Sequence, residues 1–233
     1  TLEAEYEAKG ERLAEVYAGN EDSLNIKAVE LEAYADLKNK KLAIEYSATP
    51  SGLRRCFMLR LDIEKDTLQG ILTKLPRDLR KSECAKAIKE HIVTKQIDVG
   101  MELFLIDAVN ADGHKIAWNE YRNKNILLIY GGLGCMGRSG RRELAALREE
   151  YIDDNLAIVV YYSVSTLEEL KDFRNQYSDD YIFISELMPD YSPFKIKYGV
   201  QSTPTCFVID KSGTVVLKTV GFNAEQVKIC IKK

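Results

Sequence analysis

The sequence predicts an α/β domain in the second part of the chain, preceded by an α-helical region. Up to about residue 98, apolar residues recur at helical spacing. After Gly100, short apolar runs such as ILLIY, LAIVVYY and TCFVID alternate with amphipathic segments. Strands that alternate with helices are typical of a three-layer fold with a largely parallel sheet. We therefore expect a helical N-terminal region over 1–98 and an α/β domain over 99–233.

Composition narrows the classes of function. The chain has 233 residues, a hydrophobic fraction of 45%, a charged fraction of 30% and a formal net charge of −3. This balance provides no broad basic face, so we do not expect nucleic-acid binding. No apolar run approaches the roughly 18 residues of a membrane span. The chain starts at Thr1 without a signal-peptide pattern, and we expect this start to be a processed or trimmed end of a longer precursor.

The helical region is predicted in segments. A rough apolar stripe follows the first 17 residues, and Ser23 is a candidate cap for a second helix that runs to about Ile44. The sequence TPSG at 49–52 interrupts the pattern. Further helical segments cover about 53–76, and Ser82 precedes a last helix with the sequence CAKAIKEHIV. Charged residues on these helices are expected to form solvated faces.

The cysteines and histidines do not form a metal-binding pattern. Five cysteines at irregular spacing are too few for a disulfide scaffold, and they lack the short paired spacings of a zinc site. No metal and no cofactor are therefore expected, and His91 and His114 are both predicted at the surface. Cys56 and Cys84 lie on apolar stripes and are predicted to be buried as small apolar residues, with a disulfide between them as the alternative.

The predicted α/β part begins with a hairpin and continues with alternating elements. In MELFLIDAVNADGHKIAW, the residues NADG tolerate positive φ and predict a turn between two extended segments. Trp118 is expected to seal this hairpin against the edge of the sheet. Helices are predicted over about 139–151 and 166–177, near Pro193, and from about Asn223 onward.

Cys135 lies where a buried strand is followed by a helix, in the sequence GGLGCMGRSG at 131–140. The free N–H groups at the start of a helix stabilise a thiolate, which makes Cys135 a candidate nucleophile. Arg138, one turn later, is a candidate to support that thiolate, as are Arg141 or Arg142 if either folds back. The structural alternatives are a partly buried Cys135 at the helix start and an exposed Arg138.

A second motif is YGVQSTPTCFVID, in which Pro204 separates a polar bend from an apolar strand. A proline at this place predicts a cis peptide bond, which would expose the backbone of Thr203 for pairing with an extended peptide. Tyr130, Tyr161 and Tyr162 are candidates to line a groove beside Cys135 and Pro204, but their strand positions leave open which of them faces it.

Residues 100–233 resemble the thioredoxin-fold thiol-disulfide oxidoreductases of the exported TlpA/ResA-like type. The resemblance rests on NILLIYGGLGCMGRS, LAIVVYYSVS and KYGVQSTPTCFVIDKSG. It implies a mixed sheet flanked by helices, a cis-proline loop and protein or peptide thiols and disulfides as partners. The helical region is similar to the segment that precedes this domain in Bacteroidetes-type exported members. This implies a periplasmic or cell-envelope protein, lipoprotein-anchored in its precursor. Contact with a partner through the helical region is expected if the protein is a non-catalytic binding module.

The chain departs from the family pattern at the residues of the dithiol mechanism. Cys135 matches the attacking cysteine, but Arg138 stands in the place of the resolving cysteine. Ile129 replaces a buried acid, and Gly134 replaces an aromatic residue. Turnover of a dithiol needs a second thiolate to attack the mixed disulfide, so dithiol turnover is not expected.

Cys206, two residues after Pro204, is a candidate for an unusual partner of Cys135. Its side chain would point toward the space that Ile129 lines, although a strand cysteine on an apolar face is more typical of a core.

The leading hypothesis for function is weak monothiol disulfide exchange at Cys135, or no turnover. The first alternative is a non-catalytic protein that binds peptides beside Pro204. The second is a one-cysteine peroxidase, but the Thr and Pro that precede the cysteine in peroxiredoxins have no counterpart in YGGLGC.

Overall fold

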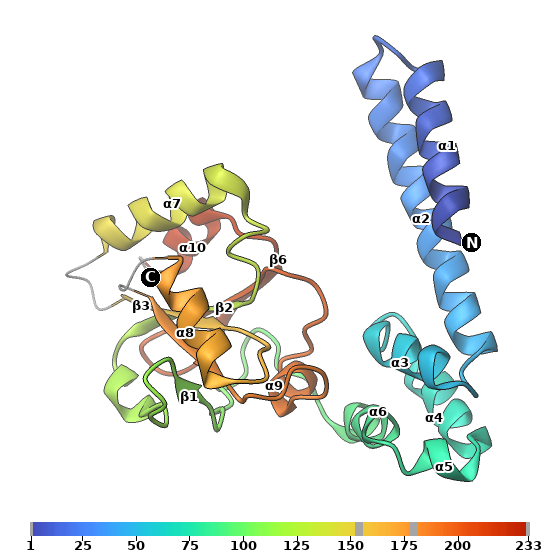
Figure 1. Cartoon of the computed structure of the whole chain (residues 1–233). Coiled ribbons are helices and arrows are strands. Elements are labelled where there is room, and N and C mark those ends of the chain that lie inside the picture. The colour runs from blue at the N-terminus through green and yellow to red at the C-terminus, as the bar shows by residue number, and fades with distance from the viewer. Residues whose placement is uncertain (1, 152–155, 178–180, 232–233) are drawn as a thin grey trace. The chain divides into compact units, whose positions relative to one another are not determined.

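The computed structural model describes residues 2–151, 156–177 and 181–231, which form two compact units (Figure 1). The first unit comprises residues 1–92 and the second residues 93–233. The division of the chain into independently folding domains at residue 98 stays a prediction. Within the described residues, none of the helices combines the length and the apolar character needed to cross a bilayer.

The first unit is helical. Its helices are α1 (Leu2–Val16), α2 (Glu21–Glu45), α3 (Pro50–Met58), α4 (Lys65–Lys74), α5 (Arg77–Arg80) and α6 (Glu83–Val93). Helix α2 begins two residues before Ser23. The amide of Ser23 donates to Oδ1 of Asn20 at 3.1 Å, so Asn20 and not Ser23 is the N-cap. The predicted cap at Ser82 is present, because its hydroxyl accepts from the amide of Ala85 at 3.2 Å.

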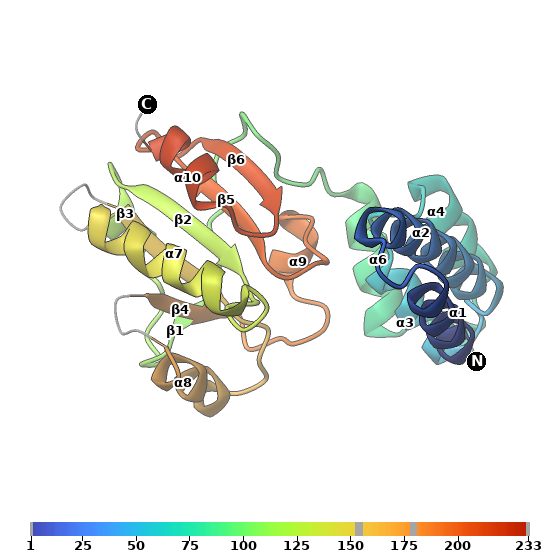
Figure 2. The ribbon, with the colours of Figure 1, turned by 90° about the horizontal axis from the view of Figure 1, so that it is seen from above.

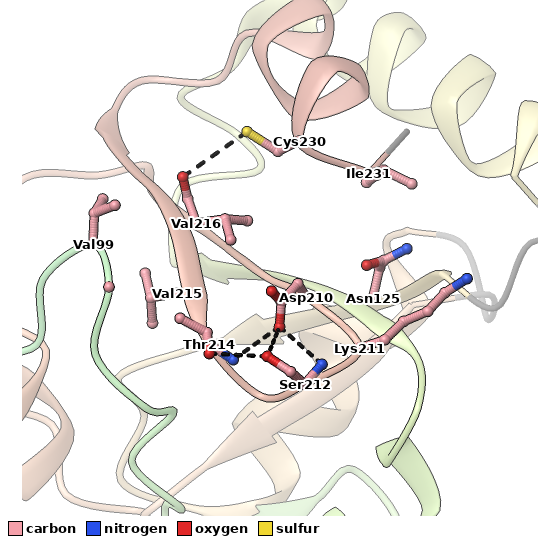
Figure 3. A pocket seen from close by; sticks show the side chains of 11 residues that line it. Val99, Asn125, Asp210, Lys211, Ser212, Thr214, Val215, Val216, Cys230 and Ile231 are labelled. Carbon is pink, nitrogen blue, oxygen red and sulfur yellow. Dashed lines mark hydrogen bonds between the residues drawn. The ribbon is translucent and has the colours of Figure 1, made fainter. Parts of the chain in front are cut away.

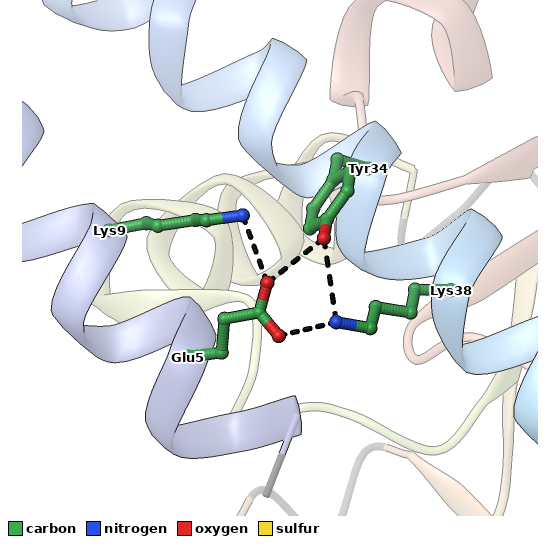
Figure 4. Close-up of polar contacts among 4 residues, drawn as sticks. All are labelled: Glu5, Lys9, Tyr34 and Lys38. Atoms are coloured by element: carbon green, nitrogen blue, oxygen red, sulfur yellow. Dashed lines mark hydrogen bonds and ion pairs between the residues drawn. The ribbon is translucent and has the colours of Figure 1, made fainter.

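Helices α1 and α2 form a hairpin that is held by polar contacts as well as by apolar ones (Figure 4). The carboxylate of Glu5 accepts hydrogen bonds from Lys9, at 3.0 Å, and from the Tyr34 hydroxyl, at 2.9 Å. Glu5 also pairs with Lys38 of α2. The bonds with the two lysines and the tyrosine lower the pKa of Glu5 to about 2. This network fixes the position of α1 along α2.

The core of the first unit lies among the shorter helices. Its buried side chains come mainly from α3, α4 and α6, and they include Leu53, Phe57, Leu68, Ile71 and Ile88. Cys56 and Cys84 are buried free thiols, whose Sγ atoms lie 3.1 Å from the Ala43 carbonyl oxygen and 3.4 Å from that of Leu53. The prediction of a surface position for His91 is wrong. Its side chain is 2% exposed, because it lies on the inner face of α6 with Cys84 and Ile88.

The second unit contains a six-stranded mixed sheet with the order β1-β4-β3-β2-β5-β6. The strands are β1 (Val109–Asn110), β2 (Asn125–Tyr130), β3 (Leu156–Tyr161), β4 (Ile182–Ser185), β5 (Thr205–Ile209) and β6 (Val215–Val220). Strand β2 is central and pairs parallel with β3 and antiparallel with β5. The strands alternate with helices α7 (Gly137–Glu150), α8 (Leu167–Asn175), α9 (Pro193–Lys197) and α10 (Ala224–Ile231), and a 3-10 turn covers Trp118–Tyr121.

Helices lie on both faces of this sheet (Figure 2), and an apolar layer packs against each face. Alternate residues of β2 point to opposite sides, so Leu127 and Ile129 join the layer of α7, α8 and α10. Leu128 and Tyr130 join the other layer, which contains Phe194 of α9 and the segment 97–108. Burial on both faces accounts for the continuous apolar runs of β2 and β3.

The predicted hairpin near residue 110 is much shorter than its sequence suggests. Asn110 uses its side chain to accept from the amides of Asp112 and His114, both at 3.0 Å, and Gly113 has φ +86°. Only Val109 and Asn110 count as strand, and they pair with β4. The residues before them lie instead beside the start of β6, since the Leu103 amide donates to the Gly213 carbonyl at 2.8 Å.

Candidate functional site

The candidate site is the bend between β2 and α7, residues 131–136. Its first two residues have left-handed backbone, with φ +54° at Gly131 and +70° at Gly132. A Cβ atom on Gly132 would lie 2.9 Å from the Pro204 nitrogen and 3.0 Å from the Thr203 Cβ. Glycine is therefore required here both by conformation and by close approach. The bend is pressed against the loop that holds Thr203 and Pro204.

Cys135 is exposed on this bend, directly before the capping residue Met136 of α7. Its Sγ atom lies 3.7 Å from Oγ1 of Thr203. The Thr203–Pro204 peptide bond is cis; Thr203 is exposed and Pro204 is buried. The fold thus brings Cys135 next to Thr203 and Pro204, which follow it by 68 and 69 positions in the sequence.

The first two turns of α7 carry three arginines, Arg138, Arg141 and Arg142, and Arg138 and Arg141 take different positions. Arg141 turns back toward the bend, where its Nη1 donates to the carbonyl oxygens of Leu133, at 3.3 Å, and Gly134, at 3.5 Å. Arg138 is exposed, and within the described residues no hydrogen bond joins it to Cys135. Arg141 therefore folds back and holds the shape of the bend through the carbonyl oxygens of the bend, whereas the sequence predicts that a fold-back of Arg141 or Arg142 would support the Cys135 thiolate.

Two tyrosines lie against the inner side of the bend. The Tyr162 hydroxyl hydrogen-bonds with the backbone of Leu133 and with the hydroxyl of Tyr177. Burial is the main cause that raises the pKa of Tyr162, and Tyr177 and Cys135 add to it. The Tyr177 hydroxyl lies 3.7 Å from the place of a Cβ on Gly134. Tyr162 was one of three candidates in the sequence, whereas Tyr177 follows the end of α8 and carried no signal.

The other two candidate tyrosines face the opposite side of the sheet. Tyr130 and Tyr161 stack with Phe194, at ring distances of 5.7 and 4.0 Å. The Tyr161 hydroxyl donates to Glu186 at 3.0 Å, and the same carboxylate accepts from the Phe194 amide at 3.1 Å. Burial raises the pKa of Glu186. This cluster anchors the start of α9 and belongs to the core of that layer.

Cys206 does not form a bridge with Cys135, because both are free thiols. It is paired directly across from Ile129, as the strand register requires, and its side chain is 0% exposed. Burial raises the pKa of Cys206 to about 12. An apolar environment keeps this thiol protonated and inert.

A pocket of about 630 Å³ lies at the other end of β2, where Asn125 begins the strand (Figure 3). The Asp210 carboxylate faces it but is engaged by a tight turn, since it accepts from the amides of Ser212, at 2.8 Å, and Thr214, at 3.0 Å. Cys230 also lines this pocket. Because Cys135 follows the opposite end of β2, the pocket is separate from the candidate site.

Among the residues that the structure describes, no group of three or more His, Cys, Asp or Glu side chains is placed to hold a metal ion.

Two features identify the fold of the second unit. They are the strand order around β2 and the cis-proline loop that faces the bend after β2. Residues 93–233 form a thioredoxin-like fold. In this thioredoxin-like unit the exposed thiol, the first turn of α7 and the Thr203–Pro204 loop lie at the same end of the sheet.

Comparisons with solved structures find proteins that are similar to this unit. One is a thiol-disulfide oxidoreductase from Bacteroides fragilis, with 17% identity, a TM-score of 0.48 and coverage of 58% of this chain and 100% of that chain. Another is the thioredoxin domain of a thiol-disulfide oxidoreductase from Bacteroides vulgatus, with 16% identity, a TM-score of 0.49 and coverage of 58% and 99%. A thiol peroxidase from Chromobacterium violaceum has 15% identity, a TM-score of 0.48 and coverage of 60% and 89%. No protein-family model and no curated protein matches the chain.

Proposed function

We propose that this protein exchanges disulfides through one thiol, Cys135, without a second cysteine of its own. The observation that carries the proposal is the exposed Sγ of Cys135, 3.7 Å from Oγ1 of Thr203 at the cis-proline loop. An extended substrate that pairs with the backbone of Thr203 would have its disulfide beside this sulfur.

The proposed reaction has two exchange steps. In the first, the Cys135 thiolate attacks one sulfur of a substrate disulfide, the substrate S–S bond breaks, and the other substrate sulfur leaves as a thiolate. In the second, an external thiolate such as glutathione attacks the substrate sulfur of the mixed disulfide. The Cys135 thiolate leaves and is restored. One disulfide is consumed and one is formed in each cycle, so electrons balance.

The surroundings of Cys135 support the monothiol form of this reaction. Arg138 occupies the position where a resolving cysteine would follow, and Cys206 is buried in the core on the strand opposite Ile129. Ile129 is itself fully buried and has no group that accepts a proton. A mixed disulfide on Cys135 therefore depends on an external thiol for its release.

A non-catalytic peptide-binding protein is the second candidate. The loss of the resolving cysteine favours it, because the loop with Thr203 and Pro204 is retained while the dithiol is not. Under either function, we place the protein in the periplasm or cell envelope on the basis of the family resemblance. Fractionation of the native host tests this placement.

Reduction of insulin with glutathione as the sole thiol tests the proposal. We expect slow reduction above the glutathione background for the wild type and for Cys230→Ser, which removes a half-buried thiol away from the bend. Cys135→Ser should give the background rate. Equal rates for the wild type and Cys135→Ser would contradict exchange and favour the binding protein. Faster consumption of hydrogen peroxide than of insulin disulfides would instead favour a peroxidase.

A further inference from the structure

Helix α2 has two apolar faces, and only one of them is used within the first unit. Leu24, Leu31 and Leu42 lie on one side at helical spacing and are partly buried on the α1 side. At 100° per residue, a second stripe lies roughly opposite to them. It consists of Ile26, Val29, Ala33 and Leu37, which we call the outer stripe.

The outer stripe is exposed to an unusual degree for apolar residues. Ile26 is 60% exposed, Val29 65% and Leu37 50%. Helix α1 lies along only one side of α2 (Figure 1), and α3 meets α2 close to Ala43, beyond the stripe. Among the described residues of the first unit, none covers the outer stripe. Contiguous apolar patches of this kind mark interaction surfaces.

Helix α1 has no comparable apolar stripe, although Tyr6 and Val16 of this helix are exposed singly. Its outer face carries glutamates at every fourth position, namely Glu3, Glu7, Glu11 and Glu15. These four residues are exposed. The outer face of α1 is thus charged, whereas the outer face of α2 is apolar.

The charges along α2 identify the partner. Its first half carries four acidic residues (Glu21, Asp22, Glu30 and Glu32) against one lysine, Lys27, whereas its second half carries three lysines (Lys38, Lys40 and Lys41) against Asp36 and Glu45. Of these lysines, Lys38 pairs with Glu5 on the α1 side. In an antiparallel pair of α2 helices, the acidic half of each helix would lie against the basic half of the other. A parallel copy would bring like charges together, which is unfavourable. Ala33 near the middle of the stripe lets two helices approach closely.

We propose that the outer stripe of α2 packs antiparallel against the outer stripe of a second copy of this chain. The two α2 helices form the centre of the dimer, and each α1 lies on the outside with its glutamates in solvent. The contact is isologous, so both copies use the same surface. It is independent of the thiol chemistry at Cys135.

The size of the stripe predicts a weak dimer. From Ile26 to Leu37 it spans eleven residues, or about 17 Å at the rise of an α-helix. A contact of this length falls at the small end of specific interfaces, so the dimer should dissociate on dilution.

The experiment is sedimentation of the full chain over a range of concentrations, with a reductant present to exclude disulfide-linked dimers through Cys135. Val29→Glu places a charge in the stripe, and we expect it to weaken dimerisation at least tenfold. Val16→Glu is the matched control, because Val16 is 64% exposed but lies at the end of α1. Circular dichroism of both variants checks that the helices are retained.

Three results would overturn the proposal. A wild-type chain that stays monomeric at all concentrations rejects the dimer and leaves the stripe to another occupant. Dissociation by Val16→Glu as strong as that by Val29→Glu rejects the stripe as the interface. Orientation is tested by Lys41→Glu, which should weaken the dimer, and by its combination with Asp22→Lys, which should restore it, because the antiparallel register that pairs Ile26 with Leu37 places Lys41 opposite Asp22. If Lys41→Glu changes nothing, the antiparallel arrangement is wrong.

Discussion

Gly132 is the residue at which the thiol-bearing bend comes closest to the proline loop. Its φ is +70°, which disfavours any residue with a side chain. A Cβ atom at this position would also lie only 2.9 Å from the Pro204 nitrogen. Gly213 has a similar φ of +87° but open space around it. The two glycines therefore separate the effect of backbone conformation from that of close contact.

We predict that Gly132→Ala lowers the free energy of unfolding of the thioredoxin-like unit by more than about 2 kcal/mol, against about 1 kcal/mol for Gly213→Ala. Urea unfolding followed by tryptophan fluorescence measures this unit alone, because Trp118 is the single tryptophan of the chain. Equal losses in the two variants would mean that the bend does not press on the proline loop.

Single residues also show what sequence reasoning reached at the site and what it missed. Cys135 was found because a strand-to-helix junction predicts a helix start that stabilises a thiolate. Pro204 was found because a proline before an apolar strand predicts a cis peptide bond. Tyr177 was not found, because it approaches the bend from a separate segment, after α8. Arg141 was one of two candidates, and only the actual direction of its side chain chose between them.

At the scale of elements, helix α6 contains a buried histidine that pattern alone placed at the surface. His91 shares the inner face of α6 with Cys84 and Ile88, at helical spacing, so its position fits the apolar stripe after all. Burial lowers the pKa of His91 to about 4, with the positive charges of Arg60 and Lys65 contributing, while a backbone hydrogen bond with Arg60 opposes the shift.

This shift predicts an acid-sensitive helical unit. A folded-state pKa below the unfolded value of about 6.5 means that the stabilisation by neutral His91 is complete above pH 6.5. It is lost as the pH falls toward 4, with an upper limit of about 3 kcal/mol.

The measurement is urea unfolding followed by circular dichroism at 222 nm, a helix-dominated signal, at pH 7 and pH 4.5. His91→Gln cannot gain the proton, so its stability should change less between these two pH values. An equal dependence on pH in both proteins would exclude His91 as the cause.

The other differences between prediction and structure at this scale have local causes. The expected long hairpin after Gly100 is reduced to two strand residues because the residues before Val109 lie beside the start of β6, where the Leu103 amide donates to the Gly213 carbonyl at 2.8 Å. The start of α2 moves from Ser23 to Glu21 because Asn20 supplies the capping oxygen. The first case rests on backbone contacts with a distant strand and the second on a side-chain hydrogen bond, and hydrophobic spacing reports neither.

At the scale of the whole molecule, the boundary predicted at residue 98 can be tested against contacts of the second unit. Ile97 is buried in the layer that contains Phe194. Its amide donates to the Lys197 carbonyl at 2.7 Å, and its carbonyl accepts from Lys218 at 2.9 Å. On the basis of these contacts we expect the folded unit to begin before residue 98.

We predict that residues 93–233, expressed alone, fold and are more stable than residues 99–233. The difference should be about 2 to 4 kcal/mol, from the buried Ile97 side chain and its two hydrogen bonds. Tryptophan fluorescence during urea unfolding of the two fragments measures it. Equal stability would support the boundary at residue 98.

The most direct test of the account is the intact mass of the full chain after reaction with oxidised glutathione. We predict one glutathione adduct, on Cys135, that persists until an external thiol is added and does not form in Cys135→Ser. An intramolecular disulfide between Cys135 and Cys206, or the lack of any adduct, would contradict the proposed monothiol exchange.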